Sequence, residues 1–331
     1  MALPSLFDRL RLPVIASPLF IISVPRLVIA QCKAGIVGSM PALNARPAAL
    51  LDDWLAEITE TLAAHDRAHP EAPAAPFAIN QIVHKSNDRL EHDLAACEKY
   101  RVPLVITSLG ARPEVNAAVH RWGGLVLHDV INDTHAHKAI DKGADGLIAV
   151  AAGAGGHAGH KNPLALVQEI RAWYDGPLAL SGAIATGDAI LAAEAMGADL
   201  AYIGSAFIAT DEARANEAYK RMVVECSSDD IVYSNLFTGV HGNYLKPSIR
   251  AAGLDPDNLP TSGPDAMNFG GARKAWKDIW GCGQGIGAVR AVEPAAARVA
   301  TLEREYLAAR RRLLGAAGGK HAQRARAAAP A

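Results

Sequence analysis

Eight short apolar runs of β-forming residues recur along the first two-thirds of the sequence, and most precede a stretch with helical character. Each run is apolar almost without interruption, which is typical of parallel strands covered on both faces. Successive runs begin 21 to 41 residues apart, enough for a strand, a loop and a crossover helix. The runs are 13–17, 35–40, 76–80, 103–107, 124–130, 145–150, 177–182 and 200–205. Eight such units predict an α/β fold, specifically a (β/α)8 TIM barrel.

The composition excludes several classes of function. Of the 331 residues, 50% are hydrophobic and 20% charged, and the net charge is −1, so no general attraction to nucleic acid is expected. The four cysteines form no C-x-x-C pair, which predicts reduced thiols rather than a zinc ribbon or a disulfide scaffold. Prolines interrupt the most apolar window, residues 12–30. We therefore expect a cytoplasmic protein without a signal peptide, membrane span or membrane partner.

The pattern changes after Ser205. A helix is predicted to begin near Asp211, and the residues that follow are rich in Gly, Pro, Asn and aromatic side chains without a regular period. Their aromatic and leucine content argues against disorder. We predict a barrel built from residues 1–211 and 273–315, with residues 212–272 inserted as a partly helical cap over its mouth. The cation-bearing Ala/Gly stretch 316–331 is predicted to be a flexible tail.

Glycines follow the seventh and eighth runs, in the segments Ser181-Gly182-Ala183 and Gly204-Ser205. Active sites of (β/α)8 barrels lie at the carboxyl ends of the strands, and the last two loops commonly bind phosphate through exposed amides. The segments therefore predict a ligand that carries phosphate. The alternative is that the glycines only permit tight turns. The sequence has no competing G-x-G-x-x-G or Walker-type phosphate motif.

The sixth run leads into GAGGHAGH, where His157 and His160 stand among glycines. A loop with so little side-chain bulk can approach a planar ligand closely. We predict that His157 is a base or an anion-stabilising group, because an unperturbed histidine changes charge near pH 6.5, at about neutrality. A structural role is the alternative, and it is favoured for His160. No ligand spacing typical of a metal site is present, so no metal is expected.

Aromatic and cationic residues also gather in NLFTGVHGNYLKPS, within the predicted insertion. Such a segment would suit a wall over a flat ligand and an anionic substrate group. The predicted substrate contacts are Phe237, His241, Tyr244 and Lys246. The alternative is that Phe237 and Tyr244 only anchor a surface loop.

Six segments in fixed order between about residues 10 and 290 carry a family resemblance: PVIASPLF, PFAIN, AGGHAG, LSGAIATG, GADLAYIGSAF and WGCGQGIG. Together they resemble the nitronate monooxygenase family, formerly the 2-nitropropane dioxygenases. The resemblance implies a barrel that binds FMN, and His157 matches the family's active-site histidine. It places the FMN phosphate on Gly182, Ala183, Gly204 and Ser205, the flavin ring near Pro18, Asn80, His128 and Gln284, and further contacts on Ser181 and the turn that contains Gly285.

The chain departs from the family pattern at two places. It reads Ala16-Ser17-Pro18-Leu19 where members often have Gln-Ala-Pro-Met, and residues 150–153 lack the Gln and Glu often found there. The resemblance implies oxidation of alkyl nitronates or nitroalkanes with O2 to carbonyl compounds and nitrite. One alternative is an FMN-dependent NAD(P)H reductase of quinones or enoyl thioesters, and another is a flavin-binding barrel without turnover. The substrate skeleton, the electron donor and the oligomeric state stay open.

Overall fold

The computed structural model describes residues 3–262 and 278–316, and a closed parallel barrel forms its centre. The strands run in the order β1-β9-β8-β6-β5-β4-β3-β2, and a parallel bridge between Ile15 and Val37 joins the two ends of the sheet. They are β1 (Val14–Ala16), β2 (Gly38–Pro41), β3 (Phe77–Ile82), β4 (Leu104–Ser108), β5 (Leu125–Val130), β6 (Gly146–Val150), β8 (Leu178–Ser181) and β9 (Leu200–Ile203). Each predicted run overlaps one strand, so the (β/α)8 prediction is confirmed.

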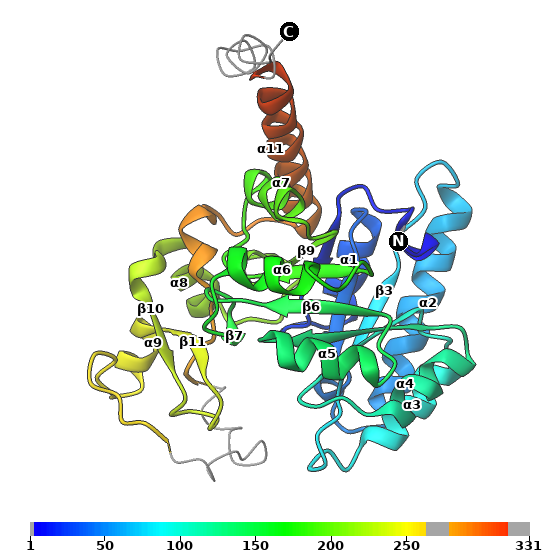
Figure 1. Ribbon diagram of the computed structural model, residues 1–331, viewed down its shortest axis with the longest axis horizontal. Coiled ribbons are helices and arrows are strands. Elements are labelled where there is room, and N and C mark those ends of the chain that lie inside the picture. The colour runs from blue at the N-terminus through cyan, green and yellow to red at the C-terminus, as the bar shows by residue number, and fades with distance from the viewer. Residues whose placement is uncertain (1–2, 263–277, 317–331) are drawn as a thin grey trace, which may run out of the picture.

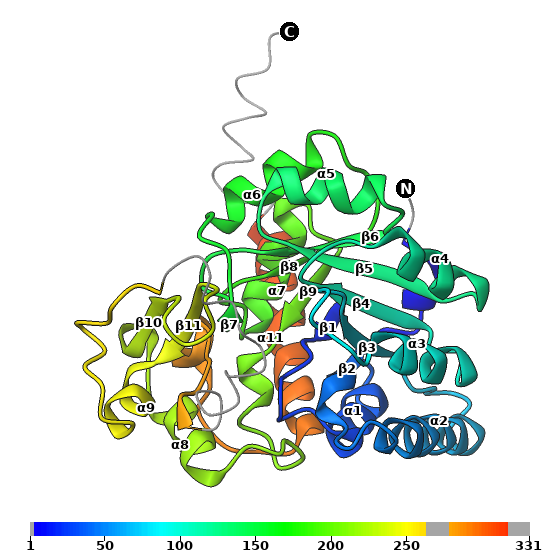
Figure 2. The ribbon, with the colours of Figure 1, turned by 90° about the horizontal axis from the view of Figure 1, so that it is seen from below.

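Helices surround the barrel (Figures 1 and 2). They are α1 (Pro25–Lys33), α2 (Leu50–Ala68), α3 (Leu90–Lys99), α4 (Pro113–Arg121), α5 (Asp133–Asp141), α6 (Pro163–Arg171) and α7 (Gly187–Met196). The side chains of Asn132, Asn162 and Thr186 cap the first amides of α5, α6 and α7. The chain returns from its insertion to α11 (Ala295–Ala316), which packs against α7 and α1. No helix in the described ranges is long and apolar enough to cross a membrane.

The barrel interior changes from apolar to polar along the strands. Side chains alternate between the two faces of a strand, so every second residue points inward. The inward apolar layer is formed by Ile15, Ala78, Ile106, Leu127, Ile148, Ala179 and Leu200. The residues two positions further along line the cavity at the barrel mouth, and they are Ser17, Asn80, Ser108, Asp129, Val150, Ser181 and Tyr202. We call these residues, except Val150, the polar floor. The polar floor therefore lies directly above the hydrophobic interior.

The insertion forms a lobe beside the barrel (Figure 1). It contains α8 (Glu217–Glu225), β10 (Ile231–Ser234), β11 (Gly242–Leu245) and α9 (Lys246–Ala251). Its small antiparallel sheet has the order β10-β11-β7, and β7 (Gly156–His157) comes from the glycine loop after β6. The lobe is therefore hydrogen-bonded to a barrel loop.

One sequence prediction in this region was wrong: α8 begins at Glu217, not near Asp211. The Asn216 side chain accepts a hydrogen bond from the Tyr219 amide at 2.8 Å and so caps the helix there. The residue before Asp211, Thr210, instead forms a bridge with Glu293, just before α11. Residues 263–272 of the predicted insertion and residues 317–331 of the predicted tail lie outside the described ranges.

Short 3-10 turns complete the described structure, and two of them adjoin the barrel mouth. These two are η3 (Ser205–Phe207), directly after β9, and η5 (Gln284–Ala288), on the returning chain. The others are η1 (Ser5–Phe7), η2 (Ala42–Asn44) and η4 (Ser228–Asp230).

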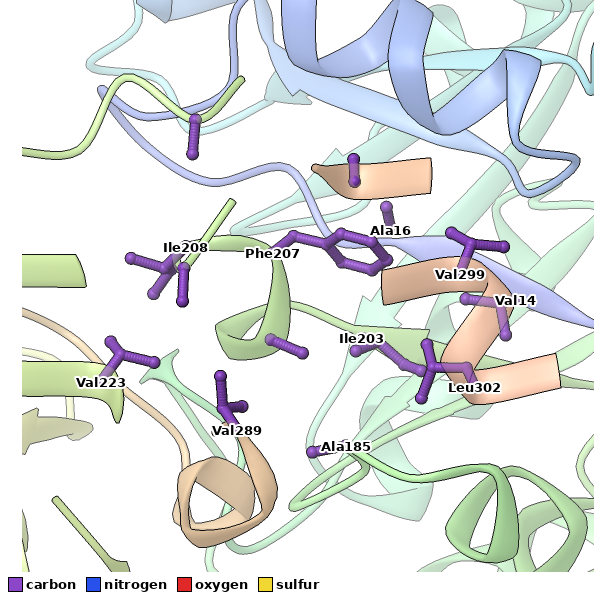
Figure 3. Packing of buried hydrophobic residues seen from close by; sticks show 14 of the residues in the cluster. Val14, Ala16, Ala185, Ile203, Phe207, Ile208, Val223, Val289, Val299 and Leu302 are labelled. Carbon is purple, nitrogen blue, oxygen red and sulfur yellow. The ribbon is translucent and has the colours of Figure 1, made fainter. Parts of the chain in front are cut away.

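One hydrophobic cluster joins the barrel, the insertion and the terminal helix (Figure 3). Phe207 lies between the barrel strands and α11, where it is fully buried. Val223 of α8 and Val289 of the returning chain belong to the same cluster, as does Leu302 of α11. The insertion therefore shares a core with the barrel and does not fold as a detached cap.

The contact between α7 and α11 depends on a glycine. A Cβ at Gly187 would lie 2.0 Å from the Tyr306 amide nitrogen and 2.3 Å from the Leu302 carbonyl oxygen. Because both are backbone atoms of a helix, Gly187→Ala should lower the free energy of unfolding by roughly 1–3 kcal/mol or more, measured by thermal or urea denaturation. Gly315→Ala, in α11 with no atom within 4 Å, is the matched control and should be neutral or slightly stabilising. Equal midpoints for the two variants would contradict the close contact.

Candidate active site

A cavity of about 1330 Å³ opens at the carboxyl ends of the strands. It collects residues from the barrel strands, the glycine loop, the insertion and the returning chain. The predicted site residues that line it are Pro18, Asn80, His128, His157, Ser181, Gly182, Ala183, Gly204, Ser205, His241 and Gly285. The fold thus brings most of the predicted site to one place.

Four predicted residues lie elsewhere. Gln284 lies behind the residues that line the cavity, and its backbone amide donates to the Gly153 carbonyl at 2.9 Å. Phe237 packs edge to face on buried Tyr244, with ring centroids 4.9 Å apart. Lys246 pairs with Asp257 at 3.4 Å. Among the four predicted substrate contacts, His241 alone lines the cavity. Phe237 and Tyr244 pack against each other within the lobe, which agrees with the alternative that they serve as anchors.

The ends of β8 and β9 form a backbone cradle. Gly182 has φ +144°, and a Cβ there would lie 2.8 Å from the Ala152 carbonyl oxygen, so only glycine fits without displacement. In the part of the chain that the structure describes, the amides of Gly204 and Ser205 have no protein acceptor. The Ala183 amide is already bonded to the Gly153 carbonyl at 3.2 Å. Two adjacent amides open to a cavity are a suitable place for an anion.

Three segments meet at this cradle with backbone against backbone. A Cβ at Gly155 would lie 2.7 Å from the Gly283 amide nitrogen, and one at Gly285 would lie 2.7 Å from the Ala183 carbonyl oxygen. The Gly283 amide also donates to Ser205 Oγ at 2.8 Å. The returning chain is thereby fixed against the loops that follow β6, β8 and β9, which makes one continuous wall.

The insertion holds His157 at the cavity. His157 is on β7 and pairs with Gly242 on β11. The amide of the neighbouring Ala158 donates to the His241 carbonyl at 3.1 Å. The Asn243 side chain donates to the Ala154 carbonyl at 2.7 Å. These bonds turn a glycine-rich loop into a short strand with a defined side-chain direction.

A hydroxyl group of the insertion holds the His157 ring. Thr238 Oγ1 lies 3.0 Å from His157 Nε2 and is itself bonded to the Val240 carbonyl at 2.9 Å. Burial lowers the pKa of His157 to about 4, which keeps the ring neutral at physiological pH.

His128 is a second neutral histidine. It is 6% exposed, and its Nδ1 lies 2.6 Å from Thr107 Oγ1. Burial, followed by the nearby charges of His135 and Lys142, lowers the pKa of His128 to about 4. The cavity therefore contains two uncharged imidazoles at neutral pH.

Sequence reasoning missed part of the site. Asp129, Ser108 and Tyr202 line the cavity as members of the polar floor. Each of them follows an inward apolar residue of the same strand by two positions, and this spacing could have predicted that they face the cavity. Tyr233, which stacks on His241 with ring centroids 5.0 Å apart, had no sequence signal. Exposed residues form the mouth of the cavity, among them Arg46, Asp88, His135, Lys138 and His160.

The described residues contain no group of three or more His, Cys, Asp or Glu side chains that could hold a metal ion. The arrangement instead combines an anion-binding backbone, a neutral base and a large cavity over a polar floor. Such a site can bind a phosphate-bearing cofactor and a small substrate together.

Solved structures share this architecture. A protein titled nitroalkane oxidase, from Streptomyces ansochromogenes, aligns with a TM-score of 0.76 at 24% identity over 93% of this chain and 99% of that chain. FabK from Thermotoga maritima aligns with a TM-score of 0.77 at 21% identity over 94% and 97% of the two chains. These similarities concern the fold.

Sequence comparisons identify the family. A relative named nitronate monooxygenase, from Paraburkholderia phytofirmans, is 27% identical over 88% of this chain and 92% of its own length. The family model described as nitronate monooxygenase matches residues 5–247, most of the chain. The chain therefore belongs to the nitronate monooxygenase family and is an oxidoreductase of that family.

Proposed function

We propose that the protein is an FMN-dependent nitronate monooxygenase, which oxidises alkyl nitronates and nitroalkanes with O2 to carbonyl compounds and nitrite. The observation that carries the proposal is neutral His157, held over the same cavity as the amide cradle of Gly204 and Ser205. Family membership supports the reaction class.

The cradle fits the phosphate of FMN. Gly182, Ala183, Gly204 and Ser205 would hold that phosphate, because two of their amides need an acceptor. Pro18, Asn80 and His128 would lie beside the flavin ring, with Ser181 and Gly285 as further contacts. The bound flavin supplies the electron-transfer chemistry, which amino-acid side chains lack.

His157 would bind and deprotonate the substrate. The neutral imidazole accepts the proton from the α-carbon of a neutral nitroalkane, which becomes the nitronate while the ring becomes imidazolium. Because burial disfavours the charged ring, the imidazolium then releases this proton to the solvent at the open cavity. Preformed nitronates already lack the α-proton, so they need His157 only for binding.

Anaerobic reduction tests the function. The purified yellow protein is mixed with propyl nitronate and, separately, with NADH, and the flavin absorbance is followed. Rapid bleaching by the nitronate alone is expected. Rapid bleaching by NADH alone would favour the reductase alternative, and bleaching by neither would favour a barrel without turnover.

The cofactor should be non-covalent FMN rather than FAD, because the chain has a phosphate cradle and no dinucleotide fingerprint. Heating the protein and separating the released flavin by chromatography decides between them. Recovery of FAD, or a colourless protein that does not take up FMN, would contradict the cradle assignment.

His157→Asn should retain the flavin but lower turnover of neutral nitroethane by on the order of 10²-fold or more, the usual effect of losing a general base. Turnover of ethyl nitronate should fall less. The matched control is His160→Asn, an exposed histidine at the cavity mouth, which should behave like the wild type. Wild-type rates for His157→Asn on both substrates would make His157 structural.

His241 and Lys246 provide a paired test of the lobe. His241 lines the cavity, whereas Lys246 is paired with Asp257 outside it. His241→Ala should therefore change KM across a series of short and long nitronates, and Lys246→Ala should not. Both variants should keep the FMN spectrum. A KM change confined to Lys246→Ala would show that substrate enters from the other side of the lobe.

A further inference from the structure

The polar floor contains a half-buried acid to which the proposed reaction assigns no role. Among the described residues that line the cavity, the carboxylates are Asp88 and Asp129. Asp88 is exposed at the mouth, on the loop after β3. Asp129 is at the inner end of the cavity, two residues beyond Leu127 of the apolar layer. The accessible surface of Asp129 therefore faces the ligand space.

A directed chain of hydrogen bonds ends on Asp129. Asn80 Nδ2 donates to Ser108 Oγ at 2.8 Å and to the Ile106 carbonyl at 3.1 Å. Because the Ser108 oxygen accepts from Asn80, its own proton is available for the Asp129 carboxylate, with which it forms a hydrogen bond. The amide of Leu109 also bonds to this carboxylate, and Leu109 has φ 63°, an uncommon conformation for a branched side chain. The barrel thus positions the carboxylate with donors that carry no charge.

In the described chain, the titratable groups that line the inner cavity around Asp129 carry no positive charge to offset its carboxylate. Burial raises the pKa of Asp129 to about 6, while the bonds from Ser108 and Leu109 act in the opposite direction. At neutral pH the carboxylate is therefore mostly ionised. The other titratable groups that line the inner cavity are uncharged: His128 of the same strand, His157 of β7, and Tyr202 of β9, whose pKa is raised by burial and then by the Asp129 charge.

The cations of the cavity lie further out. On α5, which follows β5, Lys138 is exposed at the mouth, and Arg46 is exposed on the loop after β2. An anion is thus attracted at the mouth but meets a negative charge at the floor. Two like charges in a water-poor site raise the pKa of whichever group can take a proton.

We infer that Asp129 is a proton-uptake residue, and that an anionic ligand binds beside Asp129 only when Asp129 is protonated. The inference rests on the proposed function for the identity of the anion, a nitronate. As the anion enters, the carboxylate takes one proton from solvent, and the resulting O–H donates a hydrogen bond to an oxygen of the ligand. No other bond forms or breaks. Asn80 and Ser108 are positioning residues for this step.

Nitronate kinetics give the first test. If binding takes up one proton, KM for propyl nitronate should rise by roughly tenfold per pH unit above pH 7. Asp129→Asn carries no charge, so its KM should be low and independent of pH. Asp88→Asn, the other lining carboxylate, should retain the wild-type profile. Ser108→Ala removes a bond that favours the ionised form, so the rise in KM should begin roughly one to two pH units higher.

Nitrate gives a second test that does not depend on turnover. It is a planar anion with the oxygen arrangement of a nitronate and does not itself titrate in this range. Infrared spectra of the holoprotein are recorded at pH 7.5 with and without nitrate, and the second is subtracted from the first. The difference should show the C=O band of a protonated carboxylic acid. The band should be present in the wild type and in Asp88→Asn, and absent in Asp129→Asn.

The outcomes separate the two proposals. A nitrate-induced band without oxidation of any nitronate would support proton uptake by Asp129 and contradict the nitronate monooxygenase activity. Nitronate oxidation with a wild-type KM independent of pH, or spectra without a nitrate-induced band, would overturn the role of Asp129.

Discussion

Closure of the parallel sheet is the constraint on which the rest of the molecule depends. Pairing of β1 with β9, and the bridge between Ile15 and Val37, leave no open edge in the described barrel. All strands then end at one rim, so residues far apart in the chain, such as Ser17 and Tyr202 at 185 positions, line one cavity. A sheet that stayed open would spread the same side chains along an edge. The polar floor and the amide cradle both follow from closure.

Backbone contacts complete the site on one side. The loops after β6, β8 and β9 and the returning chain approach so closely that glycine is needed at Gly155 and Gly285. Strand β11 then pairs with β7 and holds His157 in place. The insertion is therefore part of the site's framework as well as a wall, and this explains why Tyr244 and Phe237 are used for packing.

The electrostatic character of the cavity comes from burial. Removal from water favours the uncharged form of every ionisable group, which lowers the pKa of His128 and His157 and raises that of Asp129. Burial is the largest cause of neutrality for both histidines, and Asp129 is kept ionised at neutral pH mainly by uncharged donors. A site of this kind responds strongly to a bound ion, since charges near buried groups are screened less than charges on the surface.

The fold was predictable because each strand carries its own local signal. An uninterrupted apolar run between turn residues identifies a doubly covered strand, and eight runs at crossover spacing leave few architectures other than a barrel. The glycine positions of the cradle and His157 in its glycine loop were predictable for a similar reason, because strand ends in this fold are functional positions.

The start of α8 and the contacts of the lobe depend on the tertiary structure. Asn216 competes with several polar residues as a helix cap, and the segment before it is paired, through Thr210, with Glu293, 83 residues away. Whether Tyr244 faces a ligand or a core depends on the register of β11 with β7 and β10, which no local pattern encodes.

The sequence by itself determined the barrel, its rim of glycine-rich strand ends and the histidine placed there, since these follow from local periodicity and strand order. Only the tertiary structure decided which way side chains at the rim point, and hence that Asp129 belongs to the floor and Lys246 lies outside the cavity. The physical reason is that direction and burial come from contacts between segments distant in the chain, and burial sets the charge of each group.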